Sequence, residues 1–386
     1  MSTGRVYLDH NAGSPLRAEA RAAMLAAVDT GGNASSVHAE GRAARRLVED
    51  ARRQVGALVG AQPASVVFSS GATEAANFLL SPAWTMGRAP LGFGALYVCT
   101  ADHPATLSGG RFASENIRQF GVDAEGIARL DVLRSLLQVH DRATGLPLVA
   151  VHGANNETGV IQPLSEIARI VKDAGGVLVV DAVQLAGRAD LDIAASGADF
   201  LILSSHKIGG PQGAGAIIGR ADLMMPVPLL RGGGQERGFR AGTENVAAIA
   251  GFGAAAKVAR DELGSAVRVA QLRDMTETGI AKIEPSAIFH GRGAVRLPNT
   301  TFFSLPDMKA ETAQIALDIA GVAVSAGSAC SSGKVGPSHV LKAMGADAAL
   351  GAVRVSLAAS NTEADVARLL DALAKLVGRH KGARAA

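Results

Sequence analysis

The sequence Leu201-Ile-Leu-Ser-Ser-His-Lys207 runs on into Ile208-Gly-Gly-Pro-Gln-Gly-Ala-Gly215, so a strongly apolar run leads to a lysine and a glycine-rich loop. The apolar residues predict a buried strand ending at Ser204, and the glycines let the backbone beyond it approach a ligand closely. A lysine at a strand end is most often only solvated, but it can also form a Schiff base with a carbonyl compound. The rest of the sequence decides between these two roles for Lys207.

Short apolar runs that alternate with helical patterns extend on both sides of this stretch. Strands are expected at 66–70, 95–100, 147–151, 177–180, 200–203 and 215–219. Helices are expected at 16–28, 39–58, 72–80, 104–120 and 163–174. Because strands that are apolar without interruption are buried on both faces, the alternation predicts an α/β fold with a mostly parallel central sheet flanked by helices. Ligands of such sheets bind beyond the carboxyl ends of the strands.

The pattern changes after a long helix expected at about 244–263, and the remaining sequence predicts a smaller α+β unit. We therefore expect a large ligand-binding domain over residues 16–257. A small domain would be made of residues 1–15 and 258–386.

Charge and hydropathy argue against two classes of partner. The 38 basic and 35 acidic residues are mixed along the chain and give a net charge of +3, so there is no basic stripe of the kind that binds nucleic acid. No run is apolar for long enough to cross a bilayer, and the first residues do not resemble a signal peptide. We expect a cytoplasmic protein that binds neither nucleic acid nor a membrane.

Polar groups follow four of the expected strands. Ser69-Ser-Gly-Ala-Thr-Glu74 reads as a strand, a turn and a helix start, which could hold a phosphate or could be an ordinary capped helix. The adjacent Asn155 and Asn156 could form a turn or hold a phenolic oxygen of a ligand. Asp181 closes an apolar strand, where a carboxylate is costly to bury without a cationic partner. Together with Lys207, these groups match pyridoxal phosphate, which needs a lysine for its aldehyde, a helix start for its phosphate and a carboxylate for its ring nitrogen.

Several motifs support this assignment and run from Tyr7 to Leu357, nearly the whole chain. They are Gly32-Asn-Ala-Ser-Ser-Val-His38, Ser70-Gly-Ala-Thr-Glu74, Asp102-His103, Asn155-Asn-Glu-Thr-Gly159, Asp181 with Gln184, Ser204-Ser-His-Lys207, Gly232-Gly-Gly-Gln-Glu-Arg237, Arg240-Ala-Gly-Thr243 and Ser325-Ala-Gly-Ser-Ala-Cys330. In these motifs the sequence resembles the cysteine desulfurases, the pyridoxal-phosphate enzymes of fold type I in the class V aminotransferase superfamily. The family supplies sulfur for iron–sulfur clusters.

The resemblance implies a role for each of several residues. Lys207 would form the Schiff base, Asp181 would pair with the ring nitrogen, and His103 would stack on the ring and assist proton transfer. The other cofactor-binding residues that it implies are Asn156 and Gln184 at the ring oxygen, and Ala72, Thr73, Ser204 and His206 at the phosphate.

Three further residues extend the implied site. Thr243 would reach the phosphate of the partner subunit, which implies a homodimer. Arg354 would bind the substrate carboxylate, a task that suits its planar pair of donors, and Asn33 would lie close by.

The two cysteines of the chain have different surroundings. Cys99 lies in an apolar run and is expected in the core. Cys330 lies among small residues, which suits an accessible thiol; by composition alone a nucleophile and an exposed spectator are equally compatible with this pattern. The family resemblance favours the nucleophile, and it also allows a transient role for Cys330 as an iron–sulfur ligand; no resident metal site is expected.

The implied reaction converts L-cysteine to L-alanine and leaves the sulfur as a persulfide on Cys330. The persulfide would then pass to a sulfur-acceptor or iron–sulfur scaffold protein. The alternatives are a selenocysteine lyase or another class V enzyme, and a non-catalytic sulfur-relay scaffold; the presence of Lys207, Asp181 and His103 argues against the last. Lys334 and Val335 stand where many relatives have small or acidic residues, which could affect the choice of acceptor.

Overall fold

The computed structural model describes residues 4–220, 224–327 and 337–385. Within these ranges, one large sheet has the strand order β10-β3-β4-β6-β7-β8-β9-β2, with β5 also paired to β4. The strands are β2 Val66–Ser69, β3 Ala83–Met86, β4 Ala89–Cys99, β5 Ile117–Phe120, β6 Leu146–His152, β7 Val177–Asp181, β8 Phe200–Ser204, β9 Gly215–Gly219 and β10 Met224–Pro226. The centre of the sheet, from β5 through β4, β6 and β7 to β8, is parallel, whereas the outer pairs are antiparallel. The expected α/β fold is therefore confirmed.

Both faces of the large sheet are buried, because successive side chains of a strand point to opposite faces. In β8, Leu201 and Leu203 contribute to one hydrophobic core and Phe200 and Ile202 to the other. All four side chains are almost fully buried. Burial on both faces of the sheet is the reason why these strands form uninterrupted apolar runs in the sequence.

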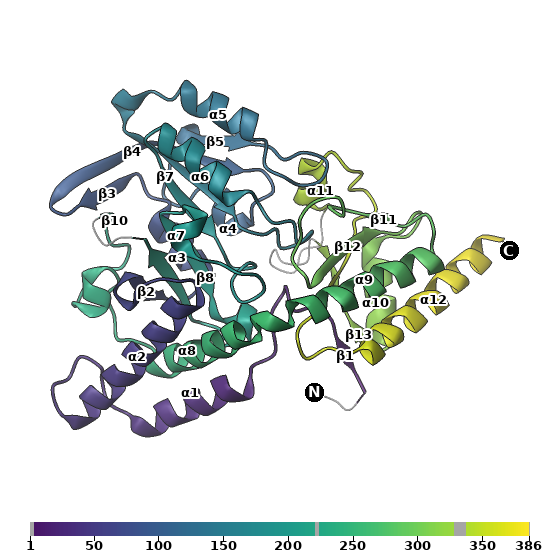
Figure 1. The fold of residues 1–386 in the computed structure, drawn as a ribbon, viewed down its shortest axis with the longest axis horizontal. Helices are drawn as coiled ribbons and strands as arrows, with labels where there is room; N and C mark the ends of the chain where they lie inside the picture. Colours follow the sequence, from purple (N-terminus) through teal and green to yellow (C-terminus); the bar gives the residue numbers. More distant parts are fainter. Residues whose placement is uncertain (1–3, 221–223, 328–336, 386) are drawn as a thin grey trace.

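Helices cover each face of the sheet (Figure 1). Helices α1 and α2 both pack against α8, and residues of all three share a core with residues of α5 and α6. Helix α3 packs on the opposite face. The helices around this sheet are α1 Ala18–Thr30, α2 Ala39–Leu58, α3 Ala72–Leu79, α4 Pro104–Leu107, α5 Leu130–Gln138, α6 Leu164–Asp173, α7 Ile193–Ser196 and α8 Val246–Asp261. Among the described residues, no helix combines the length and the apolar character that crossing a membrane requires.

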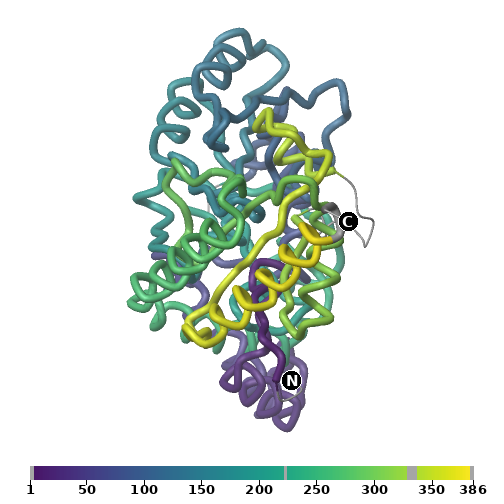
Figure 2. Tube along the Cα trace, turned by 90° about the vertical axis from the view of Figure 1, so that its right-hand side faces the viewer, coloured from purple at the N-terminus to yellow at the C-terminus, as the bar shows by residue number. Residues whose placement is uncertain are grey.

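A second, smaller body of structure has its own hydrophobic core, which includes Leu8, Phe303, Val355 and Leu369. Its sheets have the orders β11-β12-β15-β14 and β1-β13. Its elements are β1 Val6–Tyr7, α9 Ala266–Ile283, β11 Ile288–Phe289, β12 Thr300–Ser304, α10 Ala310–Ile319, β13 Val322–Ala323, β14 Ser325–Ala326, α11 His339–Ala343, β15 Val353–Ser356 and α12 Glu363–Ala385. Figure 2 shows the N-terminal segment running among these C-terminal elements, where β1 pairs with β13. The domain boundaries near residues 15 and 257 stay a prediction.

The helix expected at 104–120 is wrong. Helix α4 ends at Leu107, and Gly109 and Gly110 follow it with φ values of +74° and +58°. A side chain at Gly110 would place its Cβ 2.4 Å from the carbonyl oxygen of Leu80, so only glycine fits there. The chain turns at this point, and Ile117–Phe120 then pairs with β4 as the parallel strand β5.

Candidate functional site

A large cleft opens at the carboxyl edge of the central sheet, with a cavity volume of about 1280 Å³. Parallel strands bring their polar ends together there, since β6 ends at His152 beside Asp181 at the end of β7. The expected cofactor-binding residues that line the cleft are Ala72, Thr73, His103, Asn156, Asp181, Gln184, Ser204, His206 and Lys207. These residues come from five separate segments of the chain, and the topology alone brings them to one place.

Lys207 lies in a turn of 3-10 helix, Ser205–Ile208, directly after β8. Its Nζ donates hydrogen bonds to the backbone carbonyls of Asn11 (2.7 Å) and Ala12 (2.9 Å). The Lys207 carbonyl accepts from Ser14 Oγ at 3.2 Å. The N-terminal segment therefore forms one wall of the cleft and holds the amine at its edge.

Asp181 is partly buried at the cleft, and its removal from water is the main reason why its pKa rises to about 6. The backbone N–H of Val183, which donates to Oδ1 at 3.0 Å, lowers the pKa, whereas the nearby charge of Asp102 raises it further. A cation placed against Asp181 would favour its ionised form. The carboxylate is thus suited to a protonated nitrogen of a bound ring.

Asp102 and His152 form a buried pair behind Asp181. The distance from His152 Nδ1 to Asp102 Oδ1 is 2.6 Å, and the backbone N–H groups of Cys99 and His152 donate to the same carboxylate. The Gln162 amide donates to His152 Nε2 at 2.9 Å, so Nε2 accepts and the ring proton lies on Nδ1. The orientation of that amide is fixed because its other contacts are the Gly126 carbonyl and the Ala128 N–H.

Cys99, Asp102 and His152 are also a group of possible metal ligands in the described part of the chain, with ligand atoms within 4.8 Å of one another. The donors already serve each other through the short Asp102–His152 bond. Burial raises the pKa of the Cys99 thiol well above its usual value, which keeps it protonated and a poor ligand. We assign no metal to this group.

His103 and His206 of the cleft are neutral at pH 7. Burial is the main cause that lowers the pKa of each to about 4, and the charge of Lys207 adds to it. His103 Nδ1 accepts from the Ala105 N–H at 3.2 Å, so its proton lies on Nε2. His206 Nδ1 lies 3.0 Å from Ser204 Oγ. A neutral, fixed imidazole such as His103 can stack on an aromatic ring without repelling a cation next to it.

The start of α3 offers the anion site that the sequence predicts. Gly71 precedes Ala72 with no side chain in the way, and the first-turn amides of Ala72 and Thr73 line the cleft. Glu74 in the same turn would repel an anion, but Arg240 pairs with it at 3.0 Å. Burial raises the pKa of Glu74, yet the bonds from Arg240 and Ser70 outweigh it and the net pKa is lowered.

These groups fit pyridoxal phosphate. Among the described residues, Gln184 Oε1 is buried without a hydrogen-bond partner, while its Nε2 donates to the Asn11 carbonyl at 3.0 Å. A buried polar atom without a partner in a cleft indicates a missing ligand group. Lysine, carboxylate and helix start lie around the same space, in the arrangement that the aldehyde, ring nitrogen and phosphate of this cofactor require.

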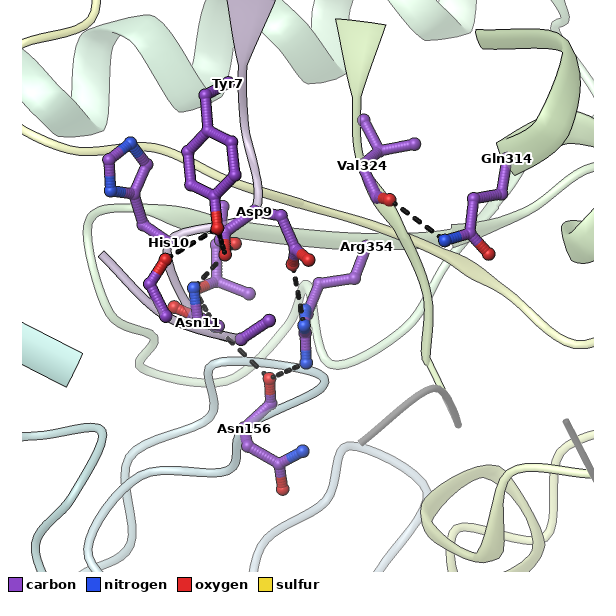
Figure 3. A network of polar contacts seen from close by, with 12 residues as sticks. Tyr7, Asp9, His10, Asn11, Asn156, Gln314, Val324 and Arg354 are labelled. Carbon is purple, nitrogen blue, oxygen red and sulfur yellow. Dashed lines mark hydrogen bonds and ion pairs between the residues drawn. The ribbon is translucent and has the colours of Figure 1, made fainter. Parts of the chain in front are cut away.

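Arg354 lies in β15 next to the cleft and is fully buried. Figure 3 shows it between Asp9 and Asn156, with Nη2 2.8 Å from Asp9 Oδ1 and Nη1 2.9 Å from the Asn156 carbonyl. It does not line the cleft directly. Asn156, whose carbonyl accepts from Arg354, does line the cleft, so one residue separates the Arg354 guanidinium from the cleft.

Besides Arg354, two expected site residues of the described part of the chain do not line this cleft. Thr243 lines an adjacent groove with Glu236 and Arg240, which shares Ser70 with the cleft wall. Asn33 is exposed in the loop between α1 and α2, where its Oδ1 accepts from the Ser35 N–H. Cys330 lies outside the described residues.

Sequence reasoning did not find two parts of the site. The carbonyls of Asn11 and Ala12 hold Lys207, and a backbone contact leaves no trace in residue types. His152 lines the cleft and orients Asp102, and it is not among the residues expected from the sequence. Its position as the last residue of an apolar strand, next to the expected asparagines, was the available signal.

A family model described as Aminotransferase class-V matches residues 6–369 of the chain. An "IscS-like cysteine desulfurase" of Mycobacterium tuberculosis is 37% identical, and the match covers 98% of this chain and 97% of the relative. A "Cysteine desulfurase" of Gluconacetobacter diazotrophicus is also 37% identical, over 97% of this chain and 94% of the relative.

Solved structures are similar over the same extent. A NifS-like protein of Rickettsia africae superposes with a TM-score of 0.85 at 31% identity, covering 96% of this chain and 99% of that protein. A structure of SspA in complex with cysteine has a TM-score of 0.73 at 25% identity, covering 91% of this chain and 98% of that protein.

Proposed function

The chain belongs to the class V aminotransferase family and, within it, to the cysteine desulfurases, and on that premise we propose that it converts L-cysteine to L-alanine by passing the sulfur to Cys330. Its cofactor is pyridoxal phosphate, as in the rest of the family. The observation that carries the proposal is the convergence of Lys207, Asp181 and His103 on one cleft.

Each of these residues has a task in the proposed reaction. Pyridoxal phosphate, when bound, supplies an electron sink for the negative charge that forms at the substrate Cα. Asp181, ionised against the ring nitrogen, keeps that nitrogen protonated. Lys207 Nζ takes the Cα proton, and neutral His103 covers the ring and helps to move protons at its Nε2.

Substrate binding is assigned to Arg354. Its planar guanidinium suits a carboxylate, and it already holds the carboxylate of Asp9 at 2.8 Å. We propose that the substrate carboxylate takes the place of Asp9 on this side chain. The exposed Asn33 would contact a substrate only from another copy of the chain, which agrees with a homodimer in which Thr243 reaches the partner's phosphate.

The sulfur step is proposed for Cys330. Its thiolate would attack the substrate sulfur, so that a sulfur–sulfur bond forms while the carbon–sulfur bond breaks. The electrons of the broken bond return to carbon, which takes up a proton and leaves as L-alanine. The persulfide would then pass to a sulfur-acceptor or iron–sulfur scaffold protein in the cytoplasm. We propose that Lys334, which follows Cys330 in the sequence, affects the choice of acceptor.

The test compares wild-type holoenzyme with Cys330→Ala, measuring sulfide and alanine release from L-cysteine with a thiol reductant present. We expect the variant to keep the absorbance of the bound cofactor and to lose both products. If Cys330→Ala matched wild type, the acceptor role would be wrong. If it lost turnover with L-cysteine but kept it with L-selenocysteine, a selenocysteine lyase would be the better assignment.

A further inference from the structure

Glu157 follows the cleft residue Asn156 in the turn after β6, but it does not line the cleft. Its side chain is only 2% exposed. The turn is rigid, because Asn155 Oδ1 accepts from the N–H groups of both Glu157 (2.9 Å) and Thr158 (3.0 Å). None of the roles assigned above uses this buried carboxylate.

The Glu157 carboxylate lies close to Gly327 and Ser338, the described residues on either side of the segment that carries Cys330. On the C-terminal side, Ser338 Oγ donates to Glu157 Oε2 at 2.6 Å. On the N-terminal side, a Cβ built on Gly327 would lie 3.0 Å from the same Oε2 and 2.7 Å from the Phe302 ring. Residues 327 and 338 are thus brought to a single point, although ten residues separate them in the sequence.

Neighbouring contacts tie the same two ends to the cleft wall. Ser325 pairs with Arg354 across β14 and β15, and Arg354 donates to the Asn156 carbonyl. His339 Nε2 lies 2.9 Å from the Asp102 carbonyl, next to the cleft residue His103. Burial raises the pKa of Glu157, and the hydrogen bond from Ser338 is the first of the contacts that oppose this rise.

We propose that Glu157 is a positioning residue for the sulfur-transfer step: it holds Gly327 and Ser338, between which Cys330 lies in the sequence, and so limits where Cys330 can reach. The inference rests on the proposed role of Cys330. It assigns Glu157 no contact with substrate or cofactor.

The test uses holoenzyme of Glu157→Ala and Glu157→Gln. In Glu157→Ala the hydrogen bond from Ser338 is lost and the side chain no longer fills the space beside Gly327. We expect alanine formation in a single turnover to fall about tenfold or more, because small displacements of a reacting group are costly. The change in cofactor absorbance on adding L-cysteine should keep its amplitude and half-saturating concentration. Glu157→Gln keeps an oxygen that can accept from Ser338, and it should stay within about threefold of wild type.

Thiol chemistry gives a readout that does not depend on turnover. We expect Glu157→Ala to change the rate at which iodoacetamide modifies Cys330, measured by mass spectrometry, and Glu157→Gln to leave it near wild type. Buried Cys99 serves as the internal standard. Glu277→Gln is the matched control, since Glu277 is an equally buried carboxylate, 2% exposed, whose partners are Arg296 and Thr301 and not Ser338.

If Glu157→Ala does not fold, substitutions at Ser338 test the same inference. Ser338→Ala removes the same hydrogen bond, whereas Ser338→Thr keeps the hydroxyl that also caps α11 at Leu341. We expect the alanine variant to be impaired and the threonine variant to be close to wild type.

Three results would overturn the inference. They are wild-type alanine formation in Glu157→Ala, equal impairment of Glu157→Ala and Glu157→Gln, and parallel loss of the absorbance change on adding L-cysteine. Failure of the proposed function itself would give a different result. In that case, wild-type enzyme alkylated at Cys330 would still form alanine. That outcome removes the acceptor role and this inference with it.

Discussion

At the scale of single residues, Asp181 shows that a partly buried carboxylate of the site can lower the stability of the cofactor-free protein. Its native pKa of about 6 lies above the value of an unfolded aspartate, about 3.9. At a pH between these two pKa values, folding is therefore accompanied by the uptake of a proton at Asp181. The contribution of Asp181 to stability is complete at low pH and is lost as the pH rises through 6.

We accordingly expect Asp181→Asn to stabilise the cofactor-free protein at pH 8, by about 2 kcal/mol. The difference should vanish below about pH 4, where the wild-type carboxyl is protonated. Urea unfolding of the two proteins at several pH values measures this. The same variant should bind the cofactor more weakly, because a neutral amide cannot keep the ring nitrogen protonated.

The control for this comparison is Asp371→Asn on the exposed face of α12, which should leave the pH dependence unchanged. An Asp181→Asn protein less stable than wild type at pH 8 would contradict the expectation. It would mean that the contact with the Val183 N–H outweighs the cost of burial.

The two cysteines allow a second prediction at this scale. Cys99 is fully buried and its pKa is raised, so it should not react in the native protein. We expect an aromatic disulfide reagent to titrate one thiol per native chain and two after unfolding. In Cys330→Ala, the native protein should give none; a fast-reacting thiol in that variant would show that Cys99 becomes exposed in the folded state.

At the scale of elements, a buried ion pair holds the loop that carries Thr243. Arg52 of α2 binds Glu236 with both terminal nitrogens, at 2.8 and 2.7 Å, and the Phe68 N–H donates to the same carboxylate. Glu236 and Arg237 have φ values of +45° and +58°, a region that residues other than glycine rarely adopt. The ion pair and its contacts stabilise this strained backbone.

Arg52→Met should destabilise the protein by about 3 to 5 kcal/mol, because it leaves the Glu236 carboxylate buried without a cation. Arg53→Met on the same helix is the matched control. Arg53 pairs with Asp50 at an exposed position, and its loss should cost less than about 1 kcal/mol. Denaturant unfolding of both variants measures the two costs; similar values would show that water reaches the Arg52 pair.

The elements also show what the sequence could and could not predict. The apolar runs that became β6, β7 and β8 were predicted because burial on both faces leaves an unbroken hydrophobic pattern. The chain over 104–120 was misread as one helix, although Gly109 and Gly110 were a visible break. The hairpin of β3 and β4 was not recognised as an extension of the sheet, since half of β3 is exposed and lacks that pattern.

The side chains that line the site could be predicted from the sequence, whereas the contacts that hold them in place could not. The types and spacing of Asp181 and Lys207 indicate chemistry, whereas the carbonyl contacts of Lys207 depend on tertiary packing alone. The gathering of nine expected residues in one cleft followed from the carboxyl-edge rule for parallel sheets. The roles of these nine residues stay predictions, as do those of Arg354, Asn33, Thr243 and Cys330.

At the scale of the whole molecule, Asn11 joins the two sheets. Its side chain bonds to Thr300 Oγ1 (2.9 Å) and Asn299 Nδ2 (3.1 Å) on the small side and to the Asn156 carbonyl (3.2 Å) on the large side. Its own carbonyl accepts from Lys207 Nζ and Gln184 Nε2. Asn11 is fully buried, so these contacts fix how the two bodies meet at the cleft.

We expect Asn11→Ala to lower the free energy of unfolding by about 2 to 4 kcal/mol, since it leaves several buried polar groups unpaired. Cofactor affinity should fall with it, because the carbonyl that holds Lys207 loses its anchor. Calorimetry and cofactor titration measure the two effects. Asn116→Ala, at an exposed position, should change neither, and an Asn11→Ala protein with full cofactor affinity would contradict the link.

The meeting of residues 327 and 338 at Glu157 has a consequence for divergence among relatives. A loop whose two ends are fixed at one point can gain, lose or replace residues between them without altering the rest of the fold, because lengthening a closed loop costs little. The stretch between these two residues can then be exchanged between relatives without a change elsewhere in the fold. If the proposed role of Cys330 holds, we expect acceptor preference to change with this stretch, while the cofactor chemistry, built from other segments, stays the same.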